Sequence, residues 1–335
     1  MKAVALLSGG LDSSLAIKLI LQQGIDVVAV NFVTPFCLCD RKTGCKKESI
    51  LISEKLNIEL KIFNISDEYL EIIKKPKYGY GKNLNPCIDC RILMFKKAKE
   101  FMNNINANFI ITGEVIGQRP MSQNRKAIEI IEKESGLEGL IVRPLSGKLL
   151  PKTIPEQNGW INRNNLLDIS GRSRKKQFNL ASEFNISGYA CPAGGCLLTD
   201  PTFSLRIKDM LNSDMLTIHN INLFKNGRYF RISNSFKLAV GRNQHENQKL
   251  ISMIQEGDII IEPETIGPTA IGRGKIENDQ DIYTASEIVA YYCKKNHNNI
   301  TINYKIFPES NYHKIIINKK IPESELLKFK IEKDS

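Results

Sequence analysis

Long apolar runs are missing from this sequence of 335 residues. No stretch reaches the roughly 18 consecutive apolar residues that a membrane-spanning helix needs, so we expect no membrane partner. Low-complexity segments and internal repeats are missing too. We also expect no removable secretion signal, because the sequence passes from Met1-Lys2 directly into a strand-like segment and a loop that cleavage would destroy. Together these absences predict a cytoplasmic protein.

An excess of acidic residues is also absent. The sequence has 47 Lys and Arg against 36 Asp and Glu, which gives a net charge of +11. A basic protein of this size often binds a polyanion, and nucleic acid is the commonest one. A general bias toward Lys, Asn and Ile is the alternative explanation. The charge favours a nucleic-acid partner.

Apolar segments alternate with helical periodicity through the first part of the chain. Lys2–Leu7 and Asp26–Phe32 read as strands, and Leu15–Gln23 between them reads as a helix that ends at Gly24. Strand, helix, strand is the repeating unit of a parallel sheet that is covered by helices on both faces. The sequence therefore predicts a doubly wound α/β fold here.

The pattern changes after Asp200. The apolar segments become shorter and are separated by Asn-Gly, Gly-Arg-Asn and Gly-Asp turns, which is typical of a smaller α+β domain. We predict an α/β domain over residues 1–205 and an α+β domain over residues 206–335.

A glycine-containing loop follows the first predicted strand. Gly9 and Gly10 allow an anion to approach the backbone, and the helix that follows directs its N–H groups to the same place. Asp12 is the only acid in the loop and could hold Mg²⁺ on phosphate oxygens. The loop lacks the Gly-Lys-Ser/Thr ending of the common mononucleotide loop, which argues against γ-phosphate transfer. A tight turn without a ligand is the alternative. The residues expected to bind phosphates are Ser8, Gly9, Gly10, Leu11, Asp12, Ser13 and Ser14.

The segment Ser8–Ser14 resembles the pyrophosphate loop of the PP-loop ATP pyrophosphatases, which have an adenine nucleotide α-hydrolase-like fold. The resemblance implies that ATP is cleaved between its α and β phosphates, that a substrate oxygen is adenylated, and that a nucleophile then displaces AMP. It also implies that Asp12 orients magnesium pyrophosphate and that Asn31 and Phe32 lie against the adenine. Amidating members often carry a glutaminase domain, of which this sequence has no sign.

Eight cysteines indicate a different nucleophile, sulfur. In a reducing cytosol they are not expected to form permanent disulfides, and their clustering points to metal binding or thiol chemistry. The segment from Cys87 to Cys90 resembles the Cys-x-x-Cys segment of tRNA thiolation enzymes that bind a [4Fe–4S] cluster through three cysteines. That resemblance implies Cys191 as the third ligand, with Cys196 as its competitor. Three thiolates would leave one iron open to hold hydrosulfide.

Other uses of these cysteines remain open at the level of sequence. A closed zinc site fits the spacing of Cys87, Cys90, Cys191 and Cys196, and a persulfide or disulfide relay is the third alternative. The earlier residues Cys37, Cys39 and Cys45 follow the second strand and could overhang the nucleotide, as persulfide carriers, as metal ligands or as ordinary loop residues. The candidate catalytic residues are Asp12, Cys37, Cys191 and Cys196.

A third motif follows the strand predicted at Asn108–Thr112, where parallel sheets place their sites. The segment from Thr112 to Gln123 resembles Thr-Gly-Glu-x-x-Gly-Gln-x-x-Ser-Gln of the 4-thiouridine synthetases. This resemblance implies that Thr112 and Gly113 contact ATP. It also implies substrate contacts for Gln118, Arg119 and Ser122.

Two further segments are candidates for RNA contact. Arg172, Arg174 and Lys175 form a basic cluster at a predicted helix start, with a solvated helix face as the alternative. Arg242 and Asn243 lie in a segment that resembles the RNA-binding domain shared with ribosome-quality-control proteins.

The sequence is therefore interpreted as an ATP-dependent tRNA uridine sulfurtransferase. The cofactors expected are ATP, Mg²⁺ and a [4Fe–4S] cluster, with Zn²⁺ as the alternative to the cluster. The partners expected are tRNA and a sulfur donor, which could be hydrosulfide, a cysteine desulfurase or a sulfur carrier. Two rivals are a sulfurtransferase acting on a small molecule or protein carrier, and a redox-sensing RNA-binding protein with a vestigial ATP site. The sequence leaves open the modified uridine and whether the protein is a homodimer.

Overall fold

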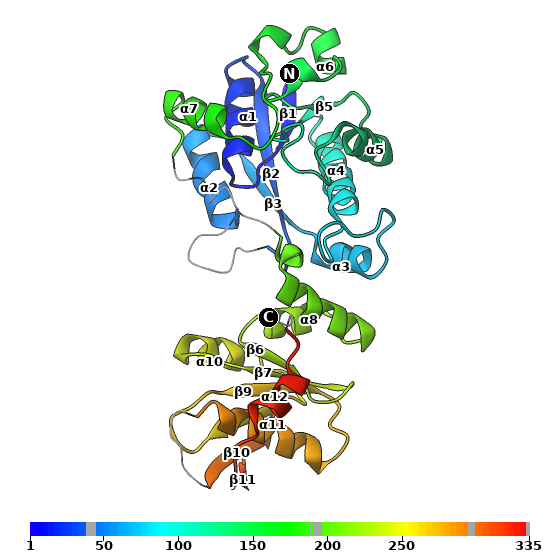
Figure 1. The fold of residues 1–335 in the computed structure, drawn as a ribbon. Helices are drawn as coiled ribbons and strands as arrows, with labels where there is room; N and C mark the ends of the chain where they lie inside the picture. Colours follow the sequence, from blue (N-terminus) through cyan, green and yellow to red (C-terminus); the bar gives the residue numbers. More distant parts are fainter. Residues whose placement is uncertain (38–44, 188, 190–195, 294–298, 333–335) are drawn as a thin grey trace. The chain divides into compact units, whose positions relative to one another are not determined.

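The computed structural model describes residues 1–37, 45–187, 189, 196–293 and 299–332. Backbone contacts divide the chain into two compact units, Met1–Thr199 and Asp200–Ser335. Each unit has its own sheet (Figure 1). The boundary predicted between residues 205 and 206 falls inside the first helix of the second unit, α8 (Pro201–Asn212), because the short turns that suggested it come only after that helix.

The first unit contains a five-stranded sheet in which neighbouring strands are parallel. Its strand order is β3-β2-β1-β4-β5. The strands are β1 (Lys2–Leu6), β2 (Asp26–Val33), β3 (Leu60–Asn64), β4 (Phe109–Thr112) and β5 (Ile141–Val142). In register, Ala3 lies opposite Val27 on one side and Phe109 on the other. The doubly wound α/β fold predicted from the sequence is confirmed.

Helices cover both faces of this sheet (Figure 1). One face carries α1 (Leu11–Leu21), α2 (Cys45–Leu56) and α7 (Lys175–Glu183), and the other carries α3 (Ser66–Lys74), α4 (Cys87–Asn104) and α5 (Arg125–Ser135). Successive residues of β1 point to opposite faces, so Ala3 and Ala5 join one core while Val4 and Leu6 join the other. This explains why the strand is apolar throughout.

Short elements complete the first unit. They are α6 (Ile154–Gln157) and the 3₁₀ turns η1 (Gly147–Leu149), η2 (Arg163–Asn165) and η3 (Leu197–Thr199). The chain runs from β1 to β2 on one side and later returns to β4 on the other side of β1. Open α/β sheets bind ligands at such a reversal of strand order, outside the carboxyl ends of the strands.

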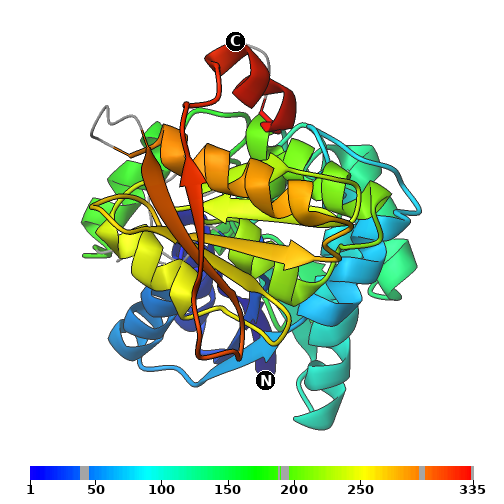
Figure 2. The same cartoon turned by 90° about the horizontal axis from the view of Figure 1, so that it is seen from below.

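The second unit contains a six-stranded antiparallel sheet in the order β11-β10-β8-β9-β7-β6. The strands are β6 (Arg228–Arg231), β7 (Phe236–Val240), β8 (Ile259–Pro263), β9 (Ala270–Gly274), β10 (Ile300–Ile306) and β11 (His313–Ile317). Its helices are α8, α9 (Ile218–Phe224), α10 (Gln244–Ile251), α11 (Asp279–Tyr291) and α12 (Glu323–Phe329). Helix α11 lies across the sheet and buries Ile288 and Val289 against it (Figure 2). The predicted α+β fold is confirmed for this unit.

Across the parts of the chain that the structure describes, every helix is too short or too polar to span a membrane.

Candidate nucleotide and thiol site

A cavity of about 290 Å³ opens at the carboxyl ends of β1, β2 and β4. It is the place where the sequence motifs of the first unit meet. Its lining includes Ser8, Gly10, Leu11, Asp12, Ser13, Asn31, Phe32, Cys37, Arg91, Thr112, Gly113, Glu114, Gln118, Arg119, Ser122, Gln123 and Arg174. The structure therefore brings together most residues that the sequence assigned to ATP and substrate.

The glycine-containing loop forms the floor of this cavity. Gly9 has φ +73°, a conformation that side-chain-bearing residues rarely adopt. Gly10 is the N-cap of α1 and supplies no side chain, while its carbonyl accepts hydrogen bonds from the hydroxyls of Ser13 (2.8 Å) and Ser14 (3.0 Å). The first N–H groups of a helix have no partner within the helix, and their dipole attracts an anion. The loop is thus built to hold phosphate.

Gly113 packs directly against this loop. A Cβ atom at Gly113 would lie 2.4 Å from the backbone nitrogen of Ser13 and 2.5 Å from the carbonyl carbon of Asp12. The third motif therefore needs a glycine here because the backbone after β4 touches the beginning of α1.

Asp12 is held by two residues that the sequence assigned to the substrate. The Nε2 group of Gln118 donates a hydrogen bond of 2.9 Å to Oδ2 of Asp12, and a guanidinium nitrogen of Arg174 lies 3.6 Å from the same oxygen. The other oxygen, Oδ1, is buried and has no hydrogen-bond partner among the residues that the structure describes. A buried carboxylate oxygen without a donor is suited to a cation.

A buried ionic network lies beside the cavity. Glu114 accepts hydrogen bonds from Arg91 (2.6 Å to Oε1) and Arg143 (3.0 Å to Oε2), and Arg143 also pairs with Glu132. Burial alone would raise the pKa of Glu114, but the two guanidinium groups outweigh it and lower that pKa. The segment that contains Glu114 stands out in the sequence, but its pairing with Arg91 and Arg143 was not predicted. Acidic and basic residues that are far apart in sequence are a weak signal of an ion pair, because each of them could pair with many others.

Positive charge gathers at the cavity mouth. Desolvation and the neighbouring guanidinium groups of Arg91 and Arg174 lower the pKa of Arg119. An arginine whose pKa is lowered by other arginines gains from a nearby anion. Ser122 is buried in the lining of the same cavity.

Four cysteines lie close to one another at one side of this region. Cys87 and Cys90 occupy the first turn of α4. Cys37 and Cys196 form an isolated antiparallel bridge. Burial raises the pKa of Cys90 to about 12 with Cys196 adding to the rise, and burial also raises the pKa of Cys196 to about 12 with Cys37 and Cys87 adding to it.

Tyr69, on α3, connects these thiols, and the sequence analysis missed it. The sulfurs of Cys90 and Cys196 lie close enough to its hydroxyl to hydrogen-bond with it. Burial, assisted by those two sulfurs, raises the pKa of Tyr69, so the hydroxyl stays protonated. The ring of Phe36 packs edge-on against it, with ring centroids 5.5 Å apart. A lone buried tyrosine in a helix gives no sequence signal of such a role.

The other predicted cysteines are placed less fully. Cys39 and Cys191 lie outside the described residues, and Cys45 begins α2. Cys293 is buried in the second unit, where its thiol contacts the Val289 carbonyl at 3.6 Å. No three His, Cys, Asp or Glu side chains within the described ranges are arranged to hold a metal ion.

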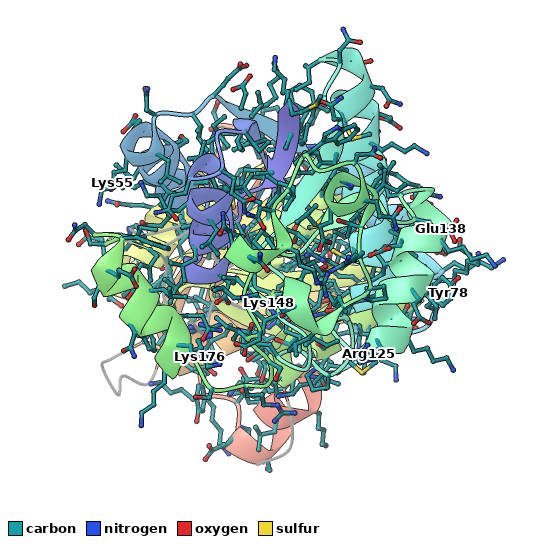
Figure 3. The ribbon with its side chains drawn as sticks, turned by 90° about the horizontal axis from the view of Figure 1, so that it is seen from above. Lys55, Tyr78, Arg125, Glu138, Lys148 and Lys176 are labelled. Atoms are coloured by element: carbon teal, nitrogen blue, oxygen red, sulfur yellow. The ribbon has the colours of Figure 1, made fainter. Side chains whose placement is uncertain are left out.

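The predicted RNA contacts occupy separate places in the chain. Arg172 and Lys175 are exposed near the start of α7. The adjacent Lys176, which is labelled in Figure 3, pairs with Asp168 at 2.9 Å on the surface. In the second unit, Asn243 caps α10 by accepting a hydrogen bond of 3.0 Å from the Glu246 amide.

Arg242 of the second unit also has local partners. Its guanidinium donates a hydrogen bond of 2.8 Å to the Gly227 carbonyl, and another of its nitrogens lies 3.6 Å from a carboxylate oxygen of Glu246. Its backbone amide donates to the same carboxylate.

Two family models match this chain, one within each of the two compact units. Residues 1–152 match the family model described as thiamine biosynthesis protein (ThiI), and residues 227–330 match the one described as NFACT protein RNA binding domain. The first unit is therefore similar to the ThiI family. The second unit contains a segment similar to the NFACT RNA-binding domain (the NFACT-type domain).

Individual relatives each match less than half of this chain. A probable tRNA sulfurtransferase of Ureaplasma parvum is 32% identical over 149 residues, which are 43% of this chain and 36% of the relative. The tRNA-specific 2-thiouridylase MnmA of Leptospira interrogans is 29% identical over 120 residues, covering 29% of this chain and 31% of the relative. The chain thus spans about a third of the length of these relatives.

Among solved structures, a 4-thiouridine synthetase–RNA complex with bound ATP is 25% identical, with coverage of 55% of this chain and 51% of that chain. Its TM-score is 0.35, which adds nothing to the sequence matches.

Proposed function

We propose that this protein is an ATP-dependent tRNA sulfurtransferase that forms AMP and pyrophosphate. One observation carries the proposal: a single cavity is lined by the phosphate-binding loop, by Asp12 and by the Cys37 thiol. An activating nucleotide and a sulfur atom could therefore meet in one place. The match to a ThiI-family model and the tRNA sulfurtransferase relatives support this assignment.

ATP would bind along the carboxyl edge of the sheet. The N–H groups at the beginning of α1 and the hydroxyls of Ser8 and Ser13 would hold the phosphates. The Asn31 side-chain amide donates a hydrogen bond of 2.7 Å to the Leu7 carbonyl. Asn31 lines the cavity, and its Oδ1 is buried without a hydrogen-bond partner among the described residues. We propose that this oxygen would accept a hydrogen bond from the adenine amino group, with Phe32 lining the same cavity.

Magnesium would bind at Asp12. The unpaired Oδ1 fits the oxygen chemistry of Mg²⁺, which takes one or two carboxylates and completes its shell with phosphate oxygens and water. Gln118 and Arg174 hold the other oxygen and so fix the direction of Oδ1. Arg119 would neutralise the pyrophosphate that leaves.

A [4Fe–4S] cluster would be held by Cys87, Cys90 and Cys191. Thiolates are the donors that such clusters require, and Cys87 and Cys90 share one helical turn. Cys191 lies outside the described residues. When bound, the cluster would supply an iron that is open to sulfur. Tyr69 would orient the Cys90 sulfur through its hydrogen bond.

The RNA substrate is proposed to be tRNA, bound with the help of the NFACT-type domain. The net charge of +11 supports a polyanionic partner. A cytoplasmic location, a homodimer and the identity of the sulfur donor stay predictions.

The test is a reconstituted reaction with the full chain, unmodified tRNA, ATP, Mg²⁺ and sulfide under anaerobic conditions. We expect AMP, pyrophosphate and thiolated nucleosides in equal amounts, quantified by chromatography and mass spectrometry. Release of ADP and phosphate would contradict adenylation. Turnover of ATP without any affinity for tRNA would favour the rival in which sulfur goes to a small molecule or a protein carrier.

A further inference from the structure

Two cysteines that are distant in sequence lie opposite each other beside the cavity. Cys37 follows β2, and Cys196 precedes η3. They form an isolated antiparallel bridge. The Leu197 amide donates a hydrogen bond of 2.9 Å to the Phe36 carbonyl, which is the bond that flanks a non-hydrogen-bonded antiparallel pair. In such a pair the two side chains stand on the same face, with Cα atoms about 4.5 Å apart.

This backbone geometry permits a disulfide. Bridged cysteines have Cα atoms about 4.4–6.8 Å apart, so Cys37 and Cys196 would lie at the short end of that range. Exposed disulfides exchange readily with small thiols, so a bridge between these two partly exposed cysteines would be reversible rather than structural. Both residues are partly exposed, so a small oxidant can reach them.

The two cysteines differ in what they face. Among the described cysteines, Cys37 is the one that lines the nucleotide cavity, and its sulfur lies 3.5 Å from the Thr34 hydroxyl. Cys196 faces Tyr69, and its sulfur accepts a hydrogen bond from the Leu198 amide. Bridging the pair would therefore remove the cavity's thiol.

We propose that Cys37 and Cys196 form a reversible disulfide whose state decides whether a thiol faces the nucleotide cavity. A low-molecular-weight disulfide, such as oxidised glutathione, is the oxidant. One cysteine thiolate attacks its S–S bond and releases the first glutathione thiolate. The second cysteine attacks the mixed disulfide and releases the other glutathione. One S–S bond breaks, one forms, and a dithiol reductant reverses the exchange.

The pairing also changes the assignment of Cys196. A cysteine that pairs with Cys37 is not required as a fourth metal ligand, which leaves Cys87, Cys90 and Cys191 as the candidate set. The effect on sulfur transfer rests on the proposed function, whereas the disulfide itself does not.

The bond can be identified by non-reducing peptide mapping of the full chain after treatment with oxidised glutathione. Trypsin leaves Cys37 with Cys39 on the peptide 19–41, and Cys196 with Cys191 on the peptide 177–206. We expect these peptides to be linked, and dithiothreitol to separate them. The link should vanish in Cys37→Ser and in Cys196→Ser but persist in Cys39→Ser, Cys191→Ser and Cys293→Ser. A link that vanishes in Cys39→Ser or Cys191→Ser, or glutathione on Cys37 with no link, would overturn the proposal.

Activity distinguishes this proposal from the proposed function. Oxidised protein should keep ATP binding but lose thiolation of tRNA, and dithiothreitol should restore it. Whatever its basal rate, Cys196→Ser should not respond to oxidised glutathione, while Cys293→Ser should respond as the unaltered chain does. Equal thiolation of tRNA by the linked and reduced forms would overturn the proposal that the disulfide controls sulfur transfer at the cavity. A linked peptide in a protein that thiolates no RNA in either state would support the disulfide and reject the sulfurtransferase function.

Discussion

The side-chain amide of Gln118 lies 2.9 Å from Oδ2 of Asp12. This hydrogen bond joins the motif after β4 to the phosphate-binding loop after β1. It uses one carboxylate oxygen and leaves the buried Oδ1 without a partner. In the proposed function the two motifs act together: the first would hold the phosphates, and the second would orient the carboxylate that binds their metal ion.

Asp12→Asn should stop adenylation without unfolding the protein. The amide keeps the size of the side chain but cannot neutralise Mg²⁺. AMP formation should fall by at least about a hundredfold, the scale of losing one preorganised electrostatic contact. Pyrophosphate release measures this, and circular dichroism checks the fold. Asp26→Asn is the control, because Asp26 pairs with Lys2 away from the cavity. Wild-type AMP formation in Asp12→Asn would remove Asp12 from the mechanism.

Gly113→Ala should damage the nucleotide site through the backbone. Its methyl group would lie 2.4 Å from the Ser13 nitrogen, so the beginning of α1 must shift. Overpacking of this kind costs about 1–3 kcal/mol of stability. We expect a lower urea midpoint and weaker ATP binding by calorimetry. Gly81→Ala is the matched control, because its methyl would meet the flexible Met121 side chain at 3.1 Å. Equal urea midpoints and equal ATP affinities for the two variants would contradict the close approach of Gly113 to the beginning of α1.

Glu114→Gln should destabilise the first unit and change its response to acid. Breaking a buried ion pair by removing one partner costs about 3–5 kcal/mol. The pKa of Glu114 is lowered below its ordinary 4.5. Its stabilising contribution is therefore present above pH 4.5 and disappears as the pH falls through the lowered value.

Urea unfolding at several pH values measures this effect. The unaltered chain should lose stability steeply below pH 4.5, whereas Glu114→Gln should be less stable at neutral pH and lose less on acidification. Asp168→Asn is the control, since its pair with Lys176 is exposed, and it should change the midpoint little. An acid response identical to that of the unaltered chain would show that Glu114 is not the titrating group.

The parts of the site that were predictable from sequence are those made by contiguous residues. Gly9 and Gly10 shape the backbone of one short loop, and Asp12 lies in the same loop. Their residue types and order were therefore enough to predict a phosphate-binding loop from the sequence. The pairing of Cys37 with Cys196 was not predictable, because it depends on the tertiary fold that brings two loops together.

One readable signal was missed in the second unit. Asn243 is followed three residues later by Glu246, a pattern typical of a helix start, and the structure uses Asn243 as the cap of α10. The RNA contact predicted for it stays a prediction, with its side-chain oxygen already engaged.

Removal of the second unit should weaken tRNA binding. A chain that ends at Thr199 keeps all residues of the cavity but lacks the NFACT-type domain. Fluorescence anisotropy should show a loss of tRNA affinity and a shallower dependence on salt, because fewer phosphate contacts release fewer counterions. ATP binding and circular dichroism check that the shortened chain is folded. Unchanged tRNA affinity would place the RNA site in the first unit, where Arg172 and Lys175 are exposed.

The anaerobically purified full chain should be brown and contain iron and sulfide. Cys87 and Cys90 share the first turn of α4, and thiolate binds iron far better than a hydroxyl does. Cys87→Ser, Cys90→Ser and Cys191→Ser should each lose iron and stop sulfur insertion, while ATP-dependent AMP formation persists. Cys196→Ser should keep its iron, because Cys87, Cys90 and Cys191 would hold the cluster without it.

Iron and zinc analysis, with the visible absorption spectrum, separates the alternatives for these cysteines. Cys293→Ser is the control, since Cys293 lies in the second unit and should affect neither metal nor colour. A closed zinc site would instead give colourless protein, and Cys196→Ser would then lose metal as fully as Cys90→Ser. Colourless protein with zinc and no iron would reject the cluster, and sulfur transfer would then depend on Cys37 at the nucleotide cavity.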